Sequence, residues 1–104
     1  MISTSAIESL VEECRVDHVG LWEVINAARF DLGASSPAEI RATTIELVRS
    51  LLEHGMHVGF PASGGKDFEP WALPTDAAIR RIEQEWSALG REPNIGEIAW
   101  FTAP

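Results

Sequence analysis

The chain has 104 residues, of which 45% are hydrophobic and 23% charged, a composition typical of a folded globular domain and not of a disordered chain. This length predicts a single domain that spans residues 1–104. Sixteen acidic against eight basic side chains give a formal net charge of −8, which repels phosphate backbones and anionic membrane surfaces. The composition therefore argues against nucleic acid and membranes as partners, and it favours a protein of basic or mixed charge.

The cysteine content and the hydropathy pattern indicate where the protein works. The single cysteine, Cys14, excludes an internal disulfide and a cysteine-rich metal site, and its place on the apolar stripe of a predicted helix favours a buried, inert thiol. The first residues lack the features of a signal peptide, and no segment approaches the roughly 18 apolar residues of a membrane span. We expect a cytoplasmic protein.

Two helices are predicted in the first third of the chain. The first begins at a capping box formed by Ser5 and Glu8, after which apolar residues recur at helical spacing. Asp17 can cap a second helix, whose wide apolar face includes Trp22. A turn should follow over residues 30–35, and its glycine should adopt the left-handed conformation.

The clearest helix lies between Ser36 and Gly55. Ser36 suits the N-cap position, Pro37 suits the first helical position because its missing N–H is not needed there, and Glu39 completes a capping box. Gly55 suits the left-handed residue that ends a helix. Apolar residues then repeat with the helical period and form one stripe, which consists of Ile40, Thr44, Leu47, Val48, Leu51 and Leu52. One face of this helix should therefore be buried.

The second half of the chain predicts two strands and one more helix. Residues 56–60 and 97–102 have the alternating, β-branched and aromatic content of strands, and they should pair antiparallel because neither has another partner. A long loop is expected over residues 62–74. A helix should run from Thr75 or Asp76 to a stop at Gly90.

These elements predict an α+β fold, a small and mainly helical domain of about four helices with a two-stranded antiparallel β-sheet. A helix-turn-helix followed by strands resembles the winged-helix superfamily over roughly residues 17–60 and 95–102. This resemblance of architecture implies DNA binding through the Ser36 helix. The chain departs from the pattern because it has a whole helix over residues 75–89, where a winged helix has a short wing, and because its charge is negative.

The motifs that could carry catalysis or bind a metal are incomplete. The segment Gly59–Asp67 looks like a phosphate-binding loop, but Phe60 stands at the first glycine position and Asp67 replaces the required hydroxyl. A flexible turn is the better interpretation. His54 and His57 have a spacing that zinc sites use, but the glycine between them breaks the helical geometry, and further ligands are missing. We expect no enzyme activity, no cofactor and no metal.

Aromatic side chains supply the candidate binding residues. Trp22 and Trp86 lie on helical apolar stripes and are expected in the core. The aromatic residues of the predicted loop, and Trp100 near the chain end, can each either cover the core or anchor a partner. The candidate partner-binding residues are Phe68, Trp71, Lys66 and Trp100.

The sequence thus predicts a non-enzymatic, acidic protein-interaction domain, of the antitoxin, immunity-protein or scaffold kind, whose partner is a basic or mixed protein. A homodimer is a further arrangement that the sequence leaves open. The alternative is a winged-helix DNA-binding regulator, in which Arg41 and Arg49 would contact phosphates although glutamates share their helix. A small-ligand sensor with a cleft beneath the loop is a third hypothesis, supported by the aromatic content alone.

Overall fold

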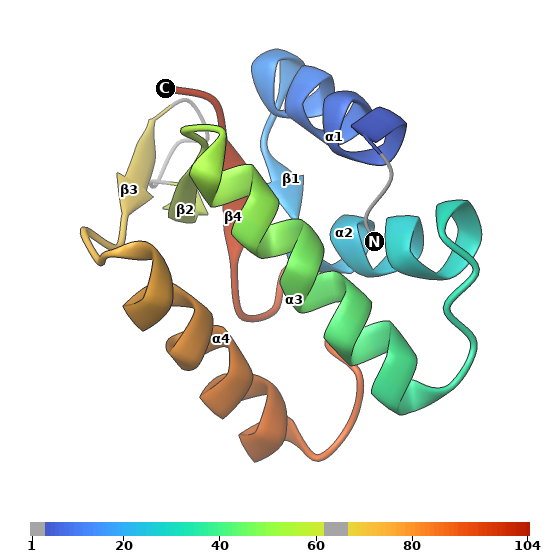
Figure 1. Cartoon of the computed structure of the whole chain (residues 1–104). Helices are drawn as coiled ribbons and strands as arrows, with labels where there is room; N and C mark the ends of the chain where they lie inside the picture. The colour runs from blue at the N-terminus through green and yellow to red at the C-terminus, as the bar shows by residue number, and fades with distance from the viewer. Residues whose placement is uncertain (1–3, 62–66) are drawn as a thin grey trace.

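The computed structural model describes residues 4–61 and 67–104, which form a small α+β domain (Figure 1). The helices in these ranges are α1 (Thr4–Val16), α2 (Leu21–Asn26), α3 (Pro37–Glu53) and α4 (Thr75–Leu89), with a π-helical segment, η1 (Ala27–Asp31), that extends α2. The strands in these ranges are β1 (Val19–Gly20), β2 (His57–Pro61), β3 (Phe68–Pro70) and β4 (Trp100–Thr102).

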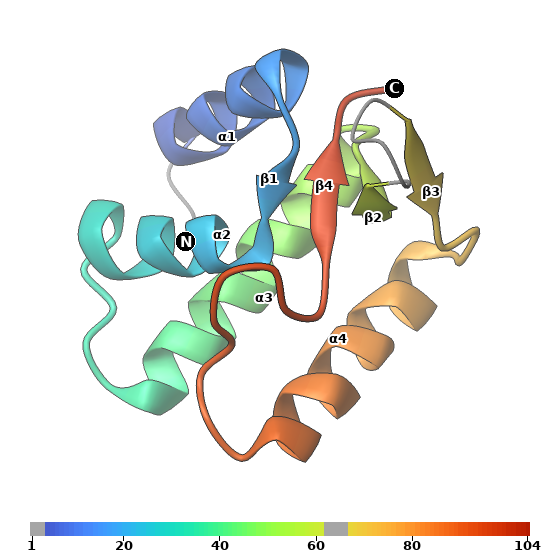
Figure 2. The same cartoon turned by 180° about the vertical axis from the view of Figure 1, so that it is seen from behind.

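The strands form one antiparallel sheet in the order β1-β4-β2-β3. The last strand in sequence, β4, therefore lies between β1 and β2 (Figure 2). Phe101 of β4 is opposite Val19 on one side and Val58 on the other. The predicted antiparallel pairing of residues 56–60 with residues 97–102 is confirmed.

The predicted two-stranded sheet is wrong, because the described residues contain two further strands. The first is β1, which lies where Asp17 was expected to cap a helix. The Asp17 carboxylate accepts a hydrogen bond at 2.7 Å from the N–H of the very next residue, so it does not cap a helical turn. The helix begins instead at Leu21, where the Glu23 carboxylate accepts the Gly20 N–H at 2.9 Å. The intervening residues are free to pair with β4.

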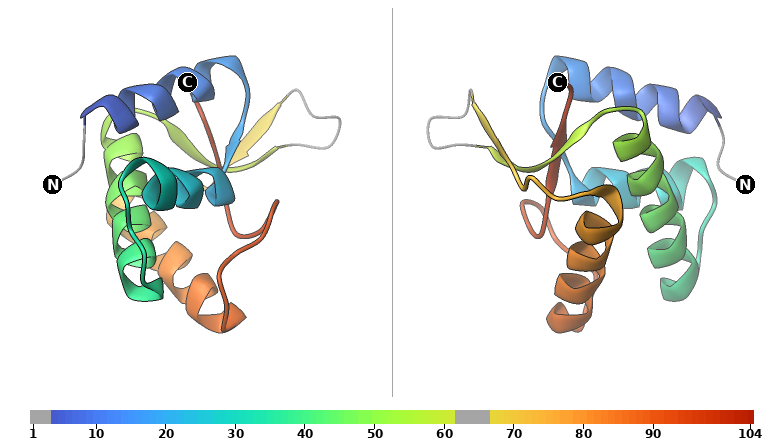
Figure 3. Two further views of the ribbon diagram at one scale, coloured as in Figure 1. Left: turned by 90° about the vertical axis from the view of Figure 1, so that its right-hand side faces the viewer. Right: turned by 60° about the vertical axis from the view of Figure 1, so that its left-hand side comes forward.

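The second additional strand, β3, lies within the predicted loop over residues 62–74. Its register is antiparallel to β2, with Phe68 opposite Pro61 and Pro70 opposite Gly59. Proline has no N–H to donate, but β3 is an edge strand and needs hydrogen bonds on one side only. Figure 3 shows that β2 and β3 together extend beyond the helical part of the molecule.

The core lies between the sheet and α3, with α1, α2 and α4 arranged around α3 (Figure 1). Phe101 from the sheet and Leu47, Val48 and Leu51 from α3 are fully buried. Complete burial of one such side chain contributes roughly 1.5–3 kcal/mol. The apolar stripe of α3 is therefore the surface on which the sheet and the other helices assemble.

The predicted ends of α3 and the glycine stops are confirmed, whereas the predicted start at Ser5 is not, because α1 already includes Thr4. Ser36 Oγ accepts the N–H of Glu39 at 3.1 Å, as the capping box requires. The predicted left-handed glycines, Gly33, Gly55 and Gly90, have φ angles of +73°, +89° and +69°. The expected turn over residues 30–35 is shorter than predicted, because η1 continues to Asp31.

The single thiol is buried, as its place on an apolar stripe predicts. Cys14 is buried in the core, and burial, with the neighbouring Glu13 and Glu23, raises the pKa of its thiol to about 12. Within residues 4–61 and 67–104, the helices are too short or too polar for any of them to cross a lipid bilayer.

Trp86 offers a direct test of the core. It lies on α4, is 7% exposed, and packs beneath the guanidinium of Arg41. We predict that Trp86→Ala lowers the free energy of unfolding by about 3–5 kcal/mol, since it leaves a cavity of nearly a whole indole. Urea denaturation followed by circular dichroism measures this loss. A melting temperature lowered by only a degree or two would place Trp86 outside the core.

Candidate functional site

The face of the sheet turned away from α3 is not crossed by any helix of the described residues (Figure 2). Side chains alternate between the two faces of a strand, so the neighbours of buried Phe101 point to this outer face. The register places Trp100 on it, next to Gly20 of β1 and Gly59 of β2. Pro70 of β3 is opposite Gly59, and Phe68, two residues before Pro70, therefore lies on the same face. Two of the predicted binding residues are thus brought to one surface.

Aromatic rings gather on this outer face in two contacts. The Trp22 and Trp100 rings meet edge to face, with centroids 4.8 Å apart and planes at 85°. The His18 and Phe68 rings lie with their centroids 5.2 Å apart, although they come from opposite edges of the sheet. All four side chains are half-buried. We call His18, Trp22, Phe68 and Trp100 the aromatic face.

Trp22 reaches this face because position 20 is glycine. An added Cβ on Gly20 would lie 1.6 Å from Cζ3 of the Trp22 ring, so the indole occupies the space that any other side chain would need. Trp22 is therefore half-buried over the sheet, and the prediction that it belongs to the core is wrong. Its place in the first turn of α2, directly after β1, turns the ring towards the strand.

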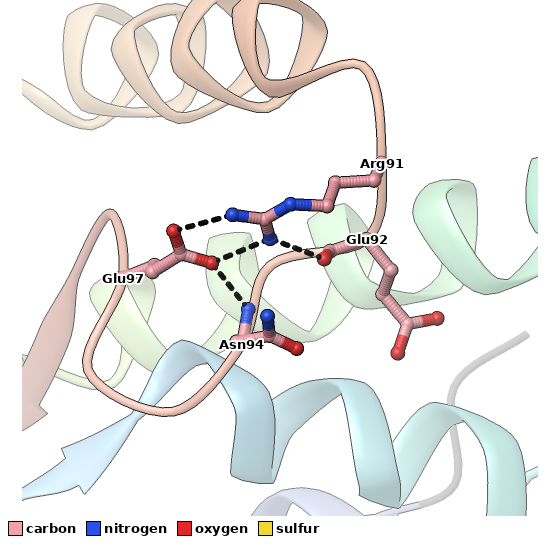
Figure 4. Close-up of polar contacts among 4 residues, drawn as sticks. All are labelled: Arg91, Glu92, Asn94 and Glu97. Atoms are coloured by element: carbon pink, nitrogen blue, oxygen red, sulfur yellow. Dashed lines mark hydrogen bonds and ion pairs between the residues drawn. The ribbon is translucent and has the colours of Figure 1, made fainter.

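The loop before β4 fixes the start of the strand that carries Trp100 (Figure 4). Arg91 donates two hydrogen bonds to the Glu97 carboxylate, at 2.7 and 2.9 Å, and the Asn94 N–H donates a third at 2.7 Å. Ile98 follows with φ +70°, a left-handed conformation that is costly for a β-branched residue, and its side chain is buried. The strand predicted over residues 97–102 is therefore shorter in the structure. It begins at Trp100, and Glu97 and Ile98 belong to the preceding loop.

Trp71 lies on the other side of the sheet. It follows Pro70, its N–H donates to the Val58 carbonyl at 3.0 Å, and its side chain packs against the core. The guanidinium of Arg81 from α4 lies 3.9 Å from the centroid of the Trp71 ring, and the Phe60 ring lies 6.1 Å away. Trp71 therefore covers the core beside α4 and does not join the aromatic face. Lys66, the fourth predicted binding residue, lies outside the described residues.

The two arginines of the DNA-binding alternative both bind α4. Arg41 donates to the Glu83 carbonyl and to Ser87 Oγ, each at 2.9 Å. Arg49 pairs with Asp76 at 2.7 Å, and this contact lowers the pKa of the Asp76 carboxyl. These two side chains connect α3 to α4.

The structure separates the other groups that the sequence analysis weighed. His54 lies at the end of α3, with Nδ1 2.7 Å from the Ser50 carbonyl, whereas His57 is exposed on β2. No group of three metal-binding side chains is found within residues 4–61 and 67–104. The central part of the segment predicted as a flexible turn, residues 62–66, lies outside the described residues.

Sequence reasoning missed half of the aromatic face. No sequence pattern assigns His18 to a binding surface, and the helical spacing of Trp22 predicts a core residue. The signal that could have identified Trp22 is Gly20, which follows Val19 and lies two residues before the tryptophan, since a glycine in a strand often marks a place where another group lies close to the backbone. The contact between the His18 and Phe68 rings depends on the order of the strands in the sheet, and a local sequence pattern does not predict that order.

Comparison with known proteins adds no relative. No family model, no curated protein and no solved structure matches this chain. The candidate site therefore stands on its geometry.

The contact of Trp22 with Gly20 can be tested by a double-mutant cycle. We predict that Gly20→Ala lowers the free energy of unfolding by about 1–3 kcal/mol, because the new methyl group displaces the indole. In a Trp22→Ala background the same change should cost much less. Equal costs in both backgrounds would mean that the ring does not occupy this space.

The loop before β4 predicts a specific sensitivity to acid. The hydrogen bonds from Arg91, together with the Asn94 N–H, lower the pKa of Glu97 from its ordinary value of 4.5 to about 2. Because the folded-state pKa is lowered, this contribution to stability is fully present above pH 4.5 and is lost as the pH falls towards 2.

The measurement compares the unfolding free energy of the wild type with that of Glu97→Gln in urea. The wild type should be the more stable at about pH 6, and its advantage should shrink steadily towards about pH 2.5. A difference that stays constant over this range would show that ionisation of Glu97 does not stabilise the loop.

Proposed function

We propose that this chain is a non-enzymatic protein-interaction domain, of the antitoxin, immunity-protein or scaffold kind, that binds a basic or mixed-charge protein on the aromatic face. The observation that carries the proposal is the outer face of the sheet, where half-buried aromatic rings lie on a surface that no helix of the described residues covers. Aromatic side chains dominate the binding energy of protein interfaces when a partner removes them from water.

The charge of the chain supports a basic partner. A formal net charge of −8 steers basic proteins towards the surface and speeds their association. Exposed charge pairs contribute only about 0–1 kcal/mol each, so affinity has to come mainly from the desolvated rings. The aromatic face would thus supply the affinity, and the acidic surface around it would select the partner.

The winged-helix relationship is a second proposal, supported by the order of the elements. The sequence α1-β1-α2-α3-β2-β3 has a helix pair followed by a hairpin, as the resemblance implies. DNA binding through α3 is less well supported, because Arg41 and Arg49 are engaged by α4 and the net charge opposes counterion release. We therefore favour the protein partner over the regulator.

Two phenylalanines of the same hairpin allow a matched test. Phe68 belongs to the aromatic face, whereas Phe60 lies on the opposite side of the sheet against Trp71. We predict that Phe68→Ala weakens binding of a partner, identified by pull-down from the native host, at least about tenfold, the loss expected for an interface anchor. Phe60→Ala should change the dissociation constant by less than about threefold.

Calorimetry with the purified partner gives both dissociation constants, and thermal melts verify that each variant is folded. Equal losses in the two variants would remove the aromatic face as the binding site. A mobility shift with mixed-sequence duplex DNA at about 0.1 M salt tests the alternative. Micromolar or tighter DNA binding would overturn the protein-interaction proposal in favour of the regulator.

A further inference from the structure

The aromatic face continues into a hollow of about 380 Å³ between α1 and the start of α2. His18 forms the junction, because it lines this hollow and also contacts the Phe68 ring. Its Nδ1 is buried and has no hydrogen-bond partner within the part of the chain that the structure describes. A second hollow, of about 430 Å³, adjoins the first, since Glu13 and Glu23 line both. The two hollows form one groove that leads away from the sheet.

This groove is lined by carboxylates from α1 and the residue that follows it, from α2 and from η1. They belong to Glu12, Glu13, Asp17, Glu23 and Asp31, and we call this surface the acidic groove. Neither hollow has a lysine or arginine in its described lining. The pKa of Glu13 is raised, first by partial burial and then by the charges of Glu23 and Asp31. Of these five carboxylates only Glu12 has an ion-pair partner among the described residues, the exposed Arg15 at 2.9 Å. Most of the negative charge of the groove is therefore left without a basic partner there.

Two apolar side chains stand exposed along the acidic groove. Val16 lines the first hollow and is 86% exposed, and Phe30 lines the second and is 74% exposed. Single exposed apolar residues are ordinary on a protein surface. These two, however, line a groove that shares His18 with the aromatic face, so the combined surface carries both apolar and acidic side chains. A complementary partner has apolar and basic side chains in one segment.

We propose that the partner places an apolar side chain on the aromatic face and that an adjoining segment rich in arginine or lysine lies in the acidic groove. This inference rests on the proposed function and names the chemistry of the partner at the same site. Charge complementarity supports this occupant, because the groove carboxylates other than Glu12 have no ion-pair partner within the part of the chain that the structure describes. A metal cation and a merely non-specific attraction to negative charge are the competing explanations.

The test uses fluorescein-labelled synthetic peptides of about 12 residues, a length that spans about 18 Å as a helix. One peptide combines arginine and leucine in an amphipathic pattern, a second replaces arginine by glutamate, and a third replaces leucine by serine. Fluorescence anisotropy at low and at moderate salt reports the dissociation constants. We expect the arginine and leucine peptide to bind the wild type most tightly, with an affinity that falls as salt screens the charges.

Two double variants separate the acidic groove from the net charge of the chain. Glu13→Gln with Glu23→Gln neutralises the groove, and the glutamine at position 23 keeps an oxygen to accept the Gly20 N–H. Glu46→Gln with Glu53→Gln removes the same charge from exposed positions on α3. We expect the groove variant to weaken the arginine and leucine peptide at least about tenfold and the α3 variant less than about twofold, since interface charges act locally.

Each other outcome decides against the proposal. Equal weakening by both double variants would show that net charge alone attracts the peptide, and no binding to the wild type would exclude a basic segment. If millimolar calcium releases the bound peptide and sodium chloride of the same ionic strength does not, the groove is a cation site. If Phe68→Ala weakens binding of the partner and the groove variant does not, the proposed function stands and this inference fails. The reverse result would reject the aromatic face instead.

Discussion

The position of β4 between β1 and β2 is the constraint on which the rest of the structure depends. A central strand has to satisfy backbone hydrogen bonds on both sides, so β4 holds the start of the chain against the hairpin of its second half. The contacts continue beyond the strand, because the Leu21 N–H donates to the Ala99 carbonyl and the Ala103 N–H donates to the Cys14 carbonyl. The end of α1 and the beginning of α2 are therefore fixed by the last residues of the chain.

The same strand builds both the core and the candidate site. Phe101 is fully buried against α3, and its neighbour Trp100 necessarily points to the outer face, where it meets Trp22. A change in the register of β4 by one residue would exchange these two side chains, exposing the phenylalanine and burying the tryptophan. Stability and the aromatic face are thus coupled through one backbone register, and the loop that Arg91 and Glu97 close lies just before this strand.

The distribution of charge follows from how the fold uses its arginines. Arg41 and Arg49 connect α3 to α4, Arg29 pairs with Glu92, and Arg81 stacks on Trp71. These contacts use positive charge to hold elements together. Along the acidic groove Glu12 pairs with Arg15 of its own helix, whereas Glu13 of α1 and Glu23 of α2 have no ion-pair partner among the described residues. Negative charge is therefore left beside the aromatic face.

The sequence by itself determined the presence of the helices, both ends of α3 and the pairing of the two longer strand segments. These features depend on local patterns, such as the capping box at Ser36 and the left-handed glycine at Gly55, whose physical causes act within a few residues. Only the tertiary structure decided that residues 19–20 and 68–70 are strands and that Trp22 leaves the core for the sheet. Such short segments have too little local preference to form strands alone, and they become strands because an adjacent strand supplies their hydrogen bonds. The meeting of Glu13 with Glu23, and of His18 with Phe68, likewise depends on chain topology, which brings together residues that no local period relates.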